Sequence, residues 1–299
     1  MSQRGEQRTK RNTEHGRGRW SSGQRKCQRE LGQNFLKDKR LARRIVVESG
    51  AGKGDLVVEL GAGGEMLTRQ LARVAREVVA VEYDPYWAKR LEERFLGDGN
   101  VRVVQEDALA VRFPNEPFVV VANIPFNLTT SILHRLLDDP TAPLKSAHLL
   151  VQKHVALKHS RSTPTTLNAL SWNPWYAFSA GLELPAGAFY PKPGVDACLM
   201  VAAKRGPPLV DPHHRHLFRA LVRRAFGGHG NAVGKTLRPI FTKTQLRRLA
   251  RENGFSVDSY PSMLTVHQWA SVFDSMIRMV PRDRWPSAKR DVKRESRRR

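Results

Sequence analysis

Short apolar runs rich in β-branched residues alternate with amphipathic stretches between residues 38 and 152. The runs have the length of buried strands, whereas the apolar residues of the intervening stretches recur with the period of a helix. Parallel strands need a crossover connection, and a helix between successive strands provides it. The alternation therefore predicts an α/β fold with a doubly wound, mostly parallel sheet.

The same pattern places the expected elements along the chain. Strands are expected at 55–60, 77–82, 101–105, 118–123 and 147–152, and helices at 41–47, 66–74, 87–95 and 131–137. Two further strands, at 176–184 and 196–203, predict an antiparallel hairpin at the sheet edge. Helical patterns return at 213–226, 243–252 and 266–278, and Thr265 with Gln268 resembles a capping box for the last.

The chain has a net charge of +23. The positive charge is densest at the two chain ends, and the region between them is also basic. Residues 1–30 and residues 281–299 each carry nine Lys or Arg against three acids, so the tails supply +12 and the 250 residues between them +11. A basic body favours a polyanion, and nucleic acid is preferred over a membrane because no spanning segment or basic amphipathic anchor is evident. We therefore expect disordered basic tails at 1–30 and 281–299, an α/β domain at 31–208 and a helical domain at 209–280 that binds nucleic acid.

Basic residues in both domains are candidates for contacts with RNA phosphates. Any single one can equally be an ordinary solvated charge, but together they predict an RNA affinity that falls steeply with salt. The candidates are Arg43, Arg44, Arg223, Arg224, Lys235 and Arg238.

Other signals exclude several classes of protein. Two cysteines, Cys27 and Cys198, imply no disulfide framework, and the N-terminus lacks the apolar region of a secretory signal, so a cytoplasmic protein is expected. Gly234-Lys235-Thr236 resembles the end of a nucleotide-binding loop but lacks its first glycine and a preceding strand. The histidines of 212–216 have no cysteine or acidic cluster beside them, so no metal is expected.

Glycines and acids follow three successive predicted strands. Glu59, Gly61 and Gly63 belong to a loop leading from the first strand into a helix, where glycines let a ligand approach the backbone. Glu82 ends the second strand, 21 residues after Gly61, a separation that suits an acid binding ribose hydroxyls. Asp107 closes the third strand and can accept a hydrogen bond from an adenine amino group. The pattern predicts a nucleoside site at the strand ends.

A fourth strand end carries the candidate catalytic residues Asn123, Ile124, Pro125 and Phe126. The amide oxygen of Asn123 and the neighbouring Ile124 carbonyl can accept both protons of an exocyclic amino group. Pro125 fixes the turn, and Phe126 offers an aromatic face on which a flipped base can stack. The alternative is a plain strand-ending turn whose phenylalanine fills the core.

Together these residues resemble the rRNA adenine N6-dimethyltransferase family over about residues 30–280. The resemblance rests on the loop 59–64, Glu82, Asp107, the segment 123–126, the proline-rich Phe189-Tyr190-Pro191-Lys192-Pro193 and Gln33-Asn34-Phe35-Leu36. Asn-Ile-Pro-Phe, the stretch 172–176 and the Arg-rich tails look like the resistance branch, the Erm type, rather than the housekeeping branch. Many relatives have Tyr in place of Phe126, so stacking is kept but a phenol hydroxyl is absent.

The resemblance implies a Rossmann-like class I methyltransferase domain with a mostly parallel seven-stranded sheet, followed by a small all-helical domain. It implies S-adenosylmethionine as methyl donor and S-adenosylhomocysteine as product. The cofactor-binding residues it implies are Asn34, Leu36, Glu59, Gly61, Gly63, Glu82, Asp107, Ala108 and Asn123. The implied reaction is N6-methylation or dimethylation of one adenine of 23S rRNA, giving macrolide-lincosamide-streptogramin-type resistance, with a monomer as the default state.

Three alternatives stay open at this point. A housekeeping enzyme of the same family would act on 16S rRNA instead. A catalytically idle assembly factor of the same fold is disfavoured by intact Asn123 and Glu82. A nicotinamide oxidoreductase is disfavoured by Met66, which stands where the third glycine of a dinucleotide fingerprint would fall.

Overall fold

A seven-stranded sheet with strand order β4-β3-β2-β5-β6-β9-β7 organises the larger domain. The computed structural model describes residues 34–228 and 230–288, so the tail expected at 1–30 lies outside the described residues. The strands are β2 (Leu56–Leu60), β3 (Glu77–Glu82), β4 (Val101–Gln105), β5 (Phe118–Ala122), β6 (Leu144–Gln152), β7 (Tyr176–Leu184) and β9 (Ala197–Lys204).

The pairing of these strands confirms the predicted topology. Strands β2 to β6 pair in parallel, whereas β9 pairs antiparallel with both β6 and β7. Strands β2 and β5 are buried along their whole length, as expected of continuous β-branched runs between two layers of helices. The predicted hairpin is therefore present, with β7 at the sheet edge.

Six helices pack around the described part of this sheet. They are α2 (Lys39–Ser49), α3 (Thr68–Leu71), α4 (Pro85–Phe95), α5 (Thr129–Leu137), α6 (Lys153–His159) and α7 (Leu167–Trp172). The carboxylates of Asp38 and Asp84 cap α2 and α4 by accepting from backbone N–H groups two residues ahead. The helix expected at 66–74 is shorter than predicted, and α6 and α7 were not predicted, because six or seven residues give too few turns for a periodic signal.

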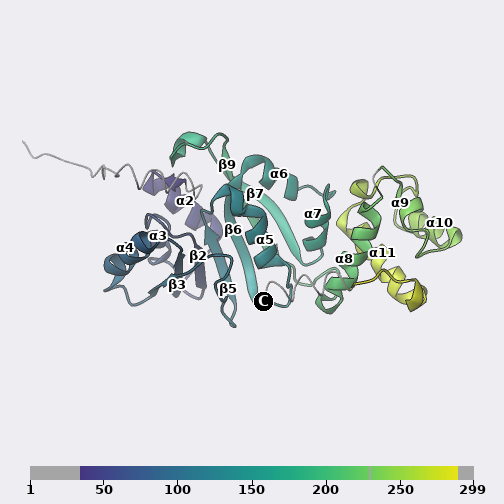
Figure 1. The fold of residues 1–299 in the computed structure, drawn as a ribbon, viewed down its shortest axis with the longest axis horizontal. Helices are drawn as coiled ribbons and strands as arrows, with labels where there is room; N and C mark the ends of the chain where they lie inside the picture. Colours follow the sequence, from purple (N-terminus) through teal and green to yellow (C-terminus); the bar gives the residue numbers. More distant parts are fainter. Residues whose placement is uncertain (1–33, 229, 289–299) are drawn as a thin grey trace, which may run out of the picture.

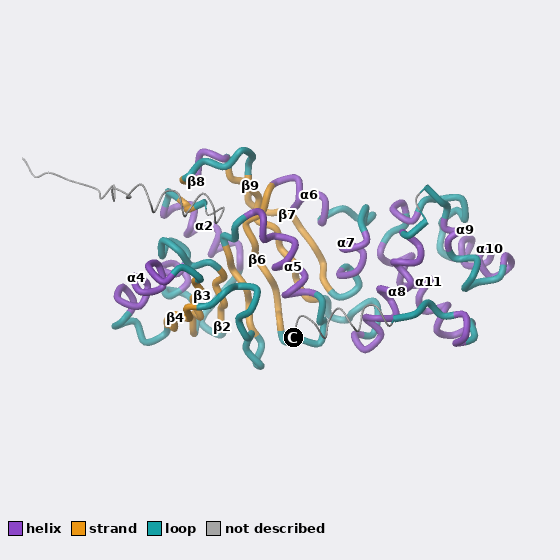
Figure 2. The backbone as a smooth tube through the Cα atoms, in the orientation of Figure 1, coloured by secondary structure: helices purple, strands orange, loops and turns teal. Residues whose placement is uncertain are grey.

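A second, two-stranded sheet pairs β1 (Phe35–Leu36) with β8 (Phe189–Tyr190). Figure 2 shows β8 near α2, apart from the large sheet. The proline-rich connection therefore does more than join β7 to β9, because it returns the chain to a segment more than 150 positions earlier. The sequence analysis did not predict this pairing.

The helical domain consists of α8 (Arg215–Phe226), α9 (Val233–Thr236), α10 (Lys243–Glu252) and α11 (Val266–Met279). It lies beyond α7, on the β7 side of the sheet (Figure 1). Capping boxes begin α10 and α11, and the one at Thr265 and Gln268 confirms the prediction. Helix α9 was not predicted.

Aromatic residues join the cores of the two domains. Trp172 and Trp175 are each 1% exposed, and the Trp175 ring meets Phe218 of α8 edge-on at 5.7 Å between centroids. One apolar cluster therefore runs from the sheet into the helical domain. Trp172 and Trp175 therefore serve core and interdomain packing.

The residue predicted to begin the C-terminal disordered tail, 281, is too early in the chain. Residues 282–284 form a helical turn, and the Trp285 indole donates to the Val280 carbonyl at 2.9 Å. Arg284 donates to the Pro239 carbonyl at 3.2 Å. The basic composition of this segment hid the packing of its single tryptophan. No helix among the described residues combines the length and apolar character needed to cross a membrane.

Candidate active site

A cavity of about 1280 Å³ lies along the carboxyl ends of β2, β3, β4 and β5. Parallel strands place the residues that follow them at one edge of the sheet, which is why distant sequence motifs meet there. All the residues predicted to bind the cofactor line this cavity, as do Asn123, Ile124 and Pro125. The residues with this predicted role are Asn34, Leu36, Glu59, Gly61, Gly63, Glu82, Asp107, Ala108 and Asn123.

The glycine loop between β2 and α3 adopts a backbone that favours glycine. Gly61 and Gly63 have φ of +72° and +49°. A Cβ atom added at Gly63 would lie 2.8 Å from Cε1 of Phe35, so the aromatic ring rests directly on the loop backbone. The Phe35 ring also lies 5.3 Å from Trp87, and β1 thereby covers one side of the cavity.

Glu82 is buried beside this loop at the end of β3. Its Oε2 accepts from the Gly63 N–H at 2.8 Å, and its Oε1 accepts from the Asp84 N–H at 2.9 Å. Burial raises the pKa of Glu82, partly offset by these backbone hydrogen bonds. Each carboxylate oxygen keeps a further lone pair, so the group fits a ligand that donates two hydroxyl hydrogen bonds.

Glu59 supplies a second buried acid in the cavity wall. It is 1% exposed, and its Oε2 has no hydrogen-bond partner among the described residues. Burial raises the pKa of Glu59 to about 8. An unpartnered buried carboxyl is costly to a protein, and a cationic ligand placed beside it would relieve that cost.

Asp107 lies at the same edge after β4. Its Oδ1 accepts from the Leu109 N–H at 2.8 Å, which fixes the carboxylate in the turn that also contains Ala108. Two oxygen atoms share the charge, and the second remains an acceptor for an amino group.

Asn123 is oriented by the segment that precedes β1. Its Nδ2 donates to the Asn34 carbonyl at 2.7 Å, so its Oδ1 remains as an acceptor. The Ile124 carbonyl has no hydrogen-bond partner in the part of the chain that the structure describes. A Cβ added at Gly61 would lie 4.0 Å from the backbone carbonyl of Asn123, so the turn that carries both acceptors adjoins the glycine loop.

Phe126 does not line the cavity as the sequence analysis expected. It begins a short 3-10 turn over Phe126–Leu128 and packs, half-buried, against the apolar cluster that includes Val119, Val121 and Leu150. Four other aromatic side chains line the cavity instead: Phe35, Tyr83, Trp87 and Tyr190.

Tyr190 was missed by sequence reasoning. The pairing in the small sheet explains its direction. Phe189 is buried in the apolar cluster opposite Leu36, so the next residue, Tyr190, lies on the other face of the strand, pairs with Phe35 and lines the cavity. Tyr190 is 44% exposed. Phe189 and Tyr190 are adjacent in the sequence, so on a strand their side chains point to opposite faces. Which of the two lines the cavity could be predicted only from the β1–β8 pairing.

The candidate RNA-binding residues form two separate groups. Arg43 and Arg44 are exposed on α2, whereas Arg224, Lys235 and Arg238 are exposed on the helical domain and Arg223 beside them is half-buried. Figure 1 shows α2 and the helical domain as separate parts of the molecule. No cluster of three or more His, Cys, Asp or Glu suited to a metal occurs among residues 34–228 and 230–288.

The sequence matches the family described as Ribosomal RNA adenine dimethylase over residues 24–278. The chain belongs to this family. It is 36% identical over 245 residues to "Mycinamicin-resistance protein MyrB" of Micromonospora griseorubida, covering 82% of this chain and 77% of that one. It is 31% identical over 268 residues to "Ribosomal RNA small subunit methyltransferase A" of Caldanaerobacter subterraneus, covering 85% of this chain and 99% of that one.

The solved structures include a similar protein of the resistance branch. The crystal structure of 23S rRNA methyltransferase ErmE superposes with a TM-score of 0.74 and 27% identity, covering 82% of this chain and all of that one. The predicted family and the predicted methyltransferase fold, with its helical C-terminal region, are therefore confirmed.

Proposed function

We propose that this protein methylates N6 of one adenine in 23S rRNA, using S-adenosylmethionine. One observation carries the proposal. The turn that carries the Asn123 side chain and the Ile124 carbonyl adjoins the glycine loop, in a cavity whose other acceptors suit a nucleoside. Membership of the family supports the same reaction.

The residues of the cavity fit this cofactor. Glu82 would hold the ribose hydroxyls, and Asp107 would accept from the adenine amino group. The Glu59 carboxyl, whose Oε2 has no hydrogen-bond partner among the described residues, fits a positively charged amino group, and the glycine loop leaves room for close approach to the backbone. S-adenosylmethionine supplies a methyl group that its positive sulfur has already activated.

The chain's own residues then have one main task, which is positioning. The lone pair of an adenine amino nitrogen is delocalised into the ring, so the nitrogen is a weak nucleophile. Acceptors at Asn123 and Ile124 would hold its two protons so that the lone pair is localised on the nitrogen and points at the methyl group. Orientation of reacting groups contributes a large share of many enzymatic rate enhancements. The proton lost from the methylated nitrogen can leave to water, so no general base is needed.

Two observations favour the large ribosomal subunit over the small one. The 23S rRNA methyltransferase ErmE superposes with a TM-score of 0.74, and the mycinamicin-resistance relative is 36% identical, against 31% for the small-subunit relative. We therefore propose macrolide-lincosamide-streptogramin-type resistance as the biological result. Action on ribosomal RNA is in keeping with a cytoplasmic protein, and we propose that it acts as a monomer.

A methyl-transfer assay tests the proposal. Purified protein and labelled S-adenosylmethionine are incubated separately with 23S and 16S rRNA, and the product is mapped by primer extension and nucleoside mass spectrometry. We expect N6-methyladenosine or N6,N6-dimethyladenosine at one position of 23S rRNA. Labelling of 16S rRNA alone would support the housekeeping alternative, and no transfer to either RNA would support the catalytically idle one.

A further inference from the structure

Helix α5 connects the acceptor pair to the helical domain. Its first residue, Thr129, donates from Oγ1 to the Phe126 carbonyl at 2.9 Å, and the Leu128 N–H donates to the Pro125 carbonyl at 2.9 Å. The catalytic turn is thus fastened to the start of α5. At about 1.5 Å per residue, the nine residues of α5 form a rigid link of about 13 Å.

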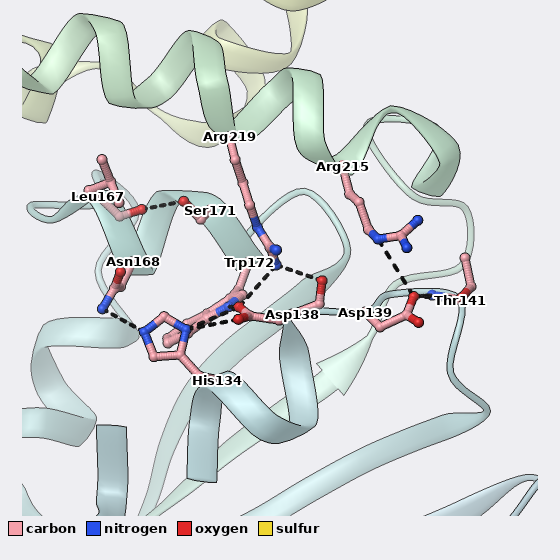
Figure 3. A network of polar contacts seen from close by, with 10 residues as sticks. All are labelled: His134, Asp138, Asp139, Thr141, Leu167, Asn168, Ser171, Trp172, Arg215 and Arg219. Atoms are coloured by element: carbon pink, nitrogen blue, oxygen red, sulfur yellow. Dashed lines mark hydrogen bonds and ion pairs between the residues drawn. The ribbon is translucent and has the colours of Figure 1, made fainter. Parts of the chain in front are cut away.

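Asp138 follows the last residue of α5 and gathers donors from three helices (Figure 3). Its Oδ1 accepts from the Trp172 indole of α7 at 2.9 Å and from Arg219 of α8 at 3.1 Å. The His134 Nδ1 of α5 lies 3.1 Å from both carboxylate oxygens. The same Arg219 nitrogen donates to the Asp138 carbonyl at 2.7 Å.

This cluster is buried and largely satisfied. The side chains of Asp138 and Arg219 are 21% and 10% exposed. Burial alone would raise the pKa of Asp138, but hydrogen bonding to His134 and the charge of Arg219 lower it to about 2. On the far side of the imidazole, the Nε2 of His134 lies 3.2 Å from the Asn168 amide. The cluster therefore holds a charged pair in one geometry.

Asp138 does not line the cavity, and the reaction described above does not use it. The second contact across the same junction is the ion pair between Arg215 and Asp139, at 3.8 Å. Both arginines belong to α8, the helix that also carries the exposed Arg224. The junction therefore sets the direction in which this basic residue faces relative to the catalytic turn.

We propose that Asp138 is a positioning residue that fixes α8 relative to Asn123 through α5, so that rRNA held by both domains presents one particular adenine. This inference rests on the proposed function. It adds a determinant of target choice that lies outside the cavity and touches neither cofactor nor base.

The test compares Asp138→Asn with Asp274→Asn. Both changes add one unit of positive charge, and Asp274 pairs with Arg278 on the exposed surface of α11, so the control corrects for electrostatic effects on RNA binding. Spin labels at Lys89→Cys on α4 and Lys243→Cys on α10, in a Cys27→Ser background, report the distance between the domains by pulsed electron resonance.

For Asp138→Asn we expect a broadened distance distribution and a kcat/KM on 23S rRNA lowered about 10-fold to 100-fold, since misplacement by about 1 Å can cost that much. We also expect methylation at neighbouring adenines, which loss of folded protein would not produce. S-adenosylmethionine affinity should stay within about twofold. Asp274→Asn should behave as wild type in every assay.

A double variant keeps the test decisive if Asp138→Asn folds poorly. Asp138→Asn/Arg219→Gln removes both charges, which is often tolerated where removal of one is not. We expect it to melt higher than the single variant but to retain the broadened distribution and the mislocated methylation. Wild-type distances and wild-type site fidelity in both variants would overturn the positioning role. Failure of the wild-type protein to methylate rRNA would instead overturn the proposed function, while the distance measurement still reports on the junction.

Discussion

The cavity at the strand ends and the junction at the end of α5 are both built around buried acids, with opposite electrostatics. Glu59 in the cavity has an oxygen without a partner, and its pKa is raised to about 8. Asp138 at the junction accepts from a ring nitrogen, an indole and a guanidinium, and its pKa is lowered to about 2. Glu59 thus has a carboxyl oxygen without a hydrogen-bond partner among the described residues, whereas the carboxylate of Asp138 accepts from three donors.

The difference between the two acids indicates that the cavity lowers the stability of the folded chain and that the junction raises it. A buried carboxyl without a cation destabilises the folded chain unless a ligand completes it. A buried carboxylate with three donors instead holds elements in one arrangement. Changes in the cavity should therefore affect ligands and chemistry, whereas changes at the junction should affect folding and the placement of the domains.

The largest expected effect is at the acceptor pair. Asn123→Ala removes one of the two acceptors, and loss of one such group typically lowers turnover about 10²-fold to 10³-fold. S-adenosylmethionine affinity should change much less, because Glu82 and the glycine loop are untouched. Single-turnover methyl transfer and calorimetric cofactor binding separate the two quantities. A turnover equal to that of wild type would remove Asn123 from the mechanism.

Glu82→Gln should mainly weaken cofactor binding. The substitution keeps the shape but weakens the hydrogen bonds from Gly63 and Asp84 and those expected from the ribose. Hydrogen bonds to a charged group contribute about 1.5–3 kcal/mol each, so we expect the dissociation constant to rise about 10-fold to 100-fold. Titration calorimetry measures it, and Glu92→Gln, an exposed acid on α4 that does not line the cavity, serves as control. Equal affinities in both variants would contradict the assignment.

Glu59→Gln and Asp138→Asn should shift thermal stability in opposite directions at pH 8.5. The folded-state pKa of Glu59 lies above its unfolded value of 4.5, so the stability that its proton provides is lost as pH rises towards 8, and Gln escapes this loss. The folded-state pKa of Asp138 lies below its unfolded value of 3.8, so its contribution is complete at pH 8.5 and is lost only as pH falls towards 2.

Thermal denaturation of the apoprotein measures both effects. We expect a melting temperature above wild type for Glu59→Gln and one below it for Asp138→Asn, since removal of one partner from a buried pair costs about 3–5 kcal/mol. The gain for Glu59→Gln should shrink at pH 5.5, where the wild-type carboxyl is protonated in the folded protein. If the melting temperatures of both variants shift in the same direction, the proposed difference between the cavity and the junction is wrong.

The sheet was predictable because its strands are continuous apolar runs. Strands β3, β4 and β7 begin and end at the predicted residues. The same runs place Glu59, Glu82 and Asp107 at strand ends, so the meeting of these acids in one cavity follows from parallel topology alone. Local sequence carried this part of the site.

The rest depends on contacts between distant segments. The two-residue strands β1 and β8 have no periodic signal of their own, yet their pairing directs Tyr190 into the cavity. The direction of Phe126 depends on the apolar cluster beneath it, which the motif does not encode. The junction around Asp138 joins residues up to 81 positions apart and could not be read from spacing.

A smaller effect should distinguish the two aromatic candidates for stacking on the target base. An aromatic contact is worth about 0.5–1.5 kcal/mol beyond its buried area, so Tyr190→Leu should raise KM for RNA about twofold to tenfold, while Tyr190→Phe stays close to wild type. Phe126→Leu should act on melting temperature instead, because the half-buried Phe126 packs against the apolar cluster. Fluorescence of 2-aminopurine at the target position reports stacking directly. Loss of stacking in Phe126→Leu but not in Tyr190→Leu would reverse this assignment.

The smallest effect concerns individual basic residues of the helical domain. Arg224→Ala/Lys235→Ala should reduce the slope of log affinity against log salt by about two, since each phosphate contact contributes about one. Lys53→Ala/Lys89→Ala removes the same charge from exposed positions of the other domain and should leave the slope nearly unchanged. Filter binding across a range of salt concentrations gives both slopes. If the two double variants have identical slopes, the proposal that these residues of the helical domain contact RNA phosphates is wrong.

A crystal structure of the protein with S-adenosylmethionine tests the central claim most directly. We expect the ligand in the cavity between the glycine loop and Asn123, with its ribose hydroxyls within about 3.2 Å of the Glu82 oxygens. Its methyl group should face the Asn123 Oδ1, and its amino group should lie beside Glu59. A ligand bound outside this cavity, or one whose methyl group faces away from Asn123, would contradict the account.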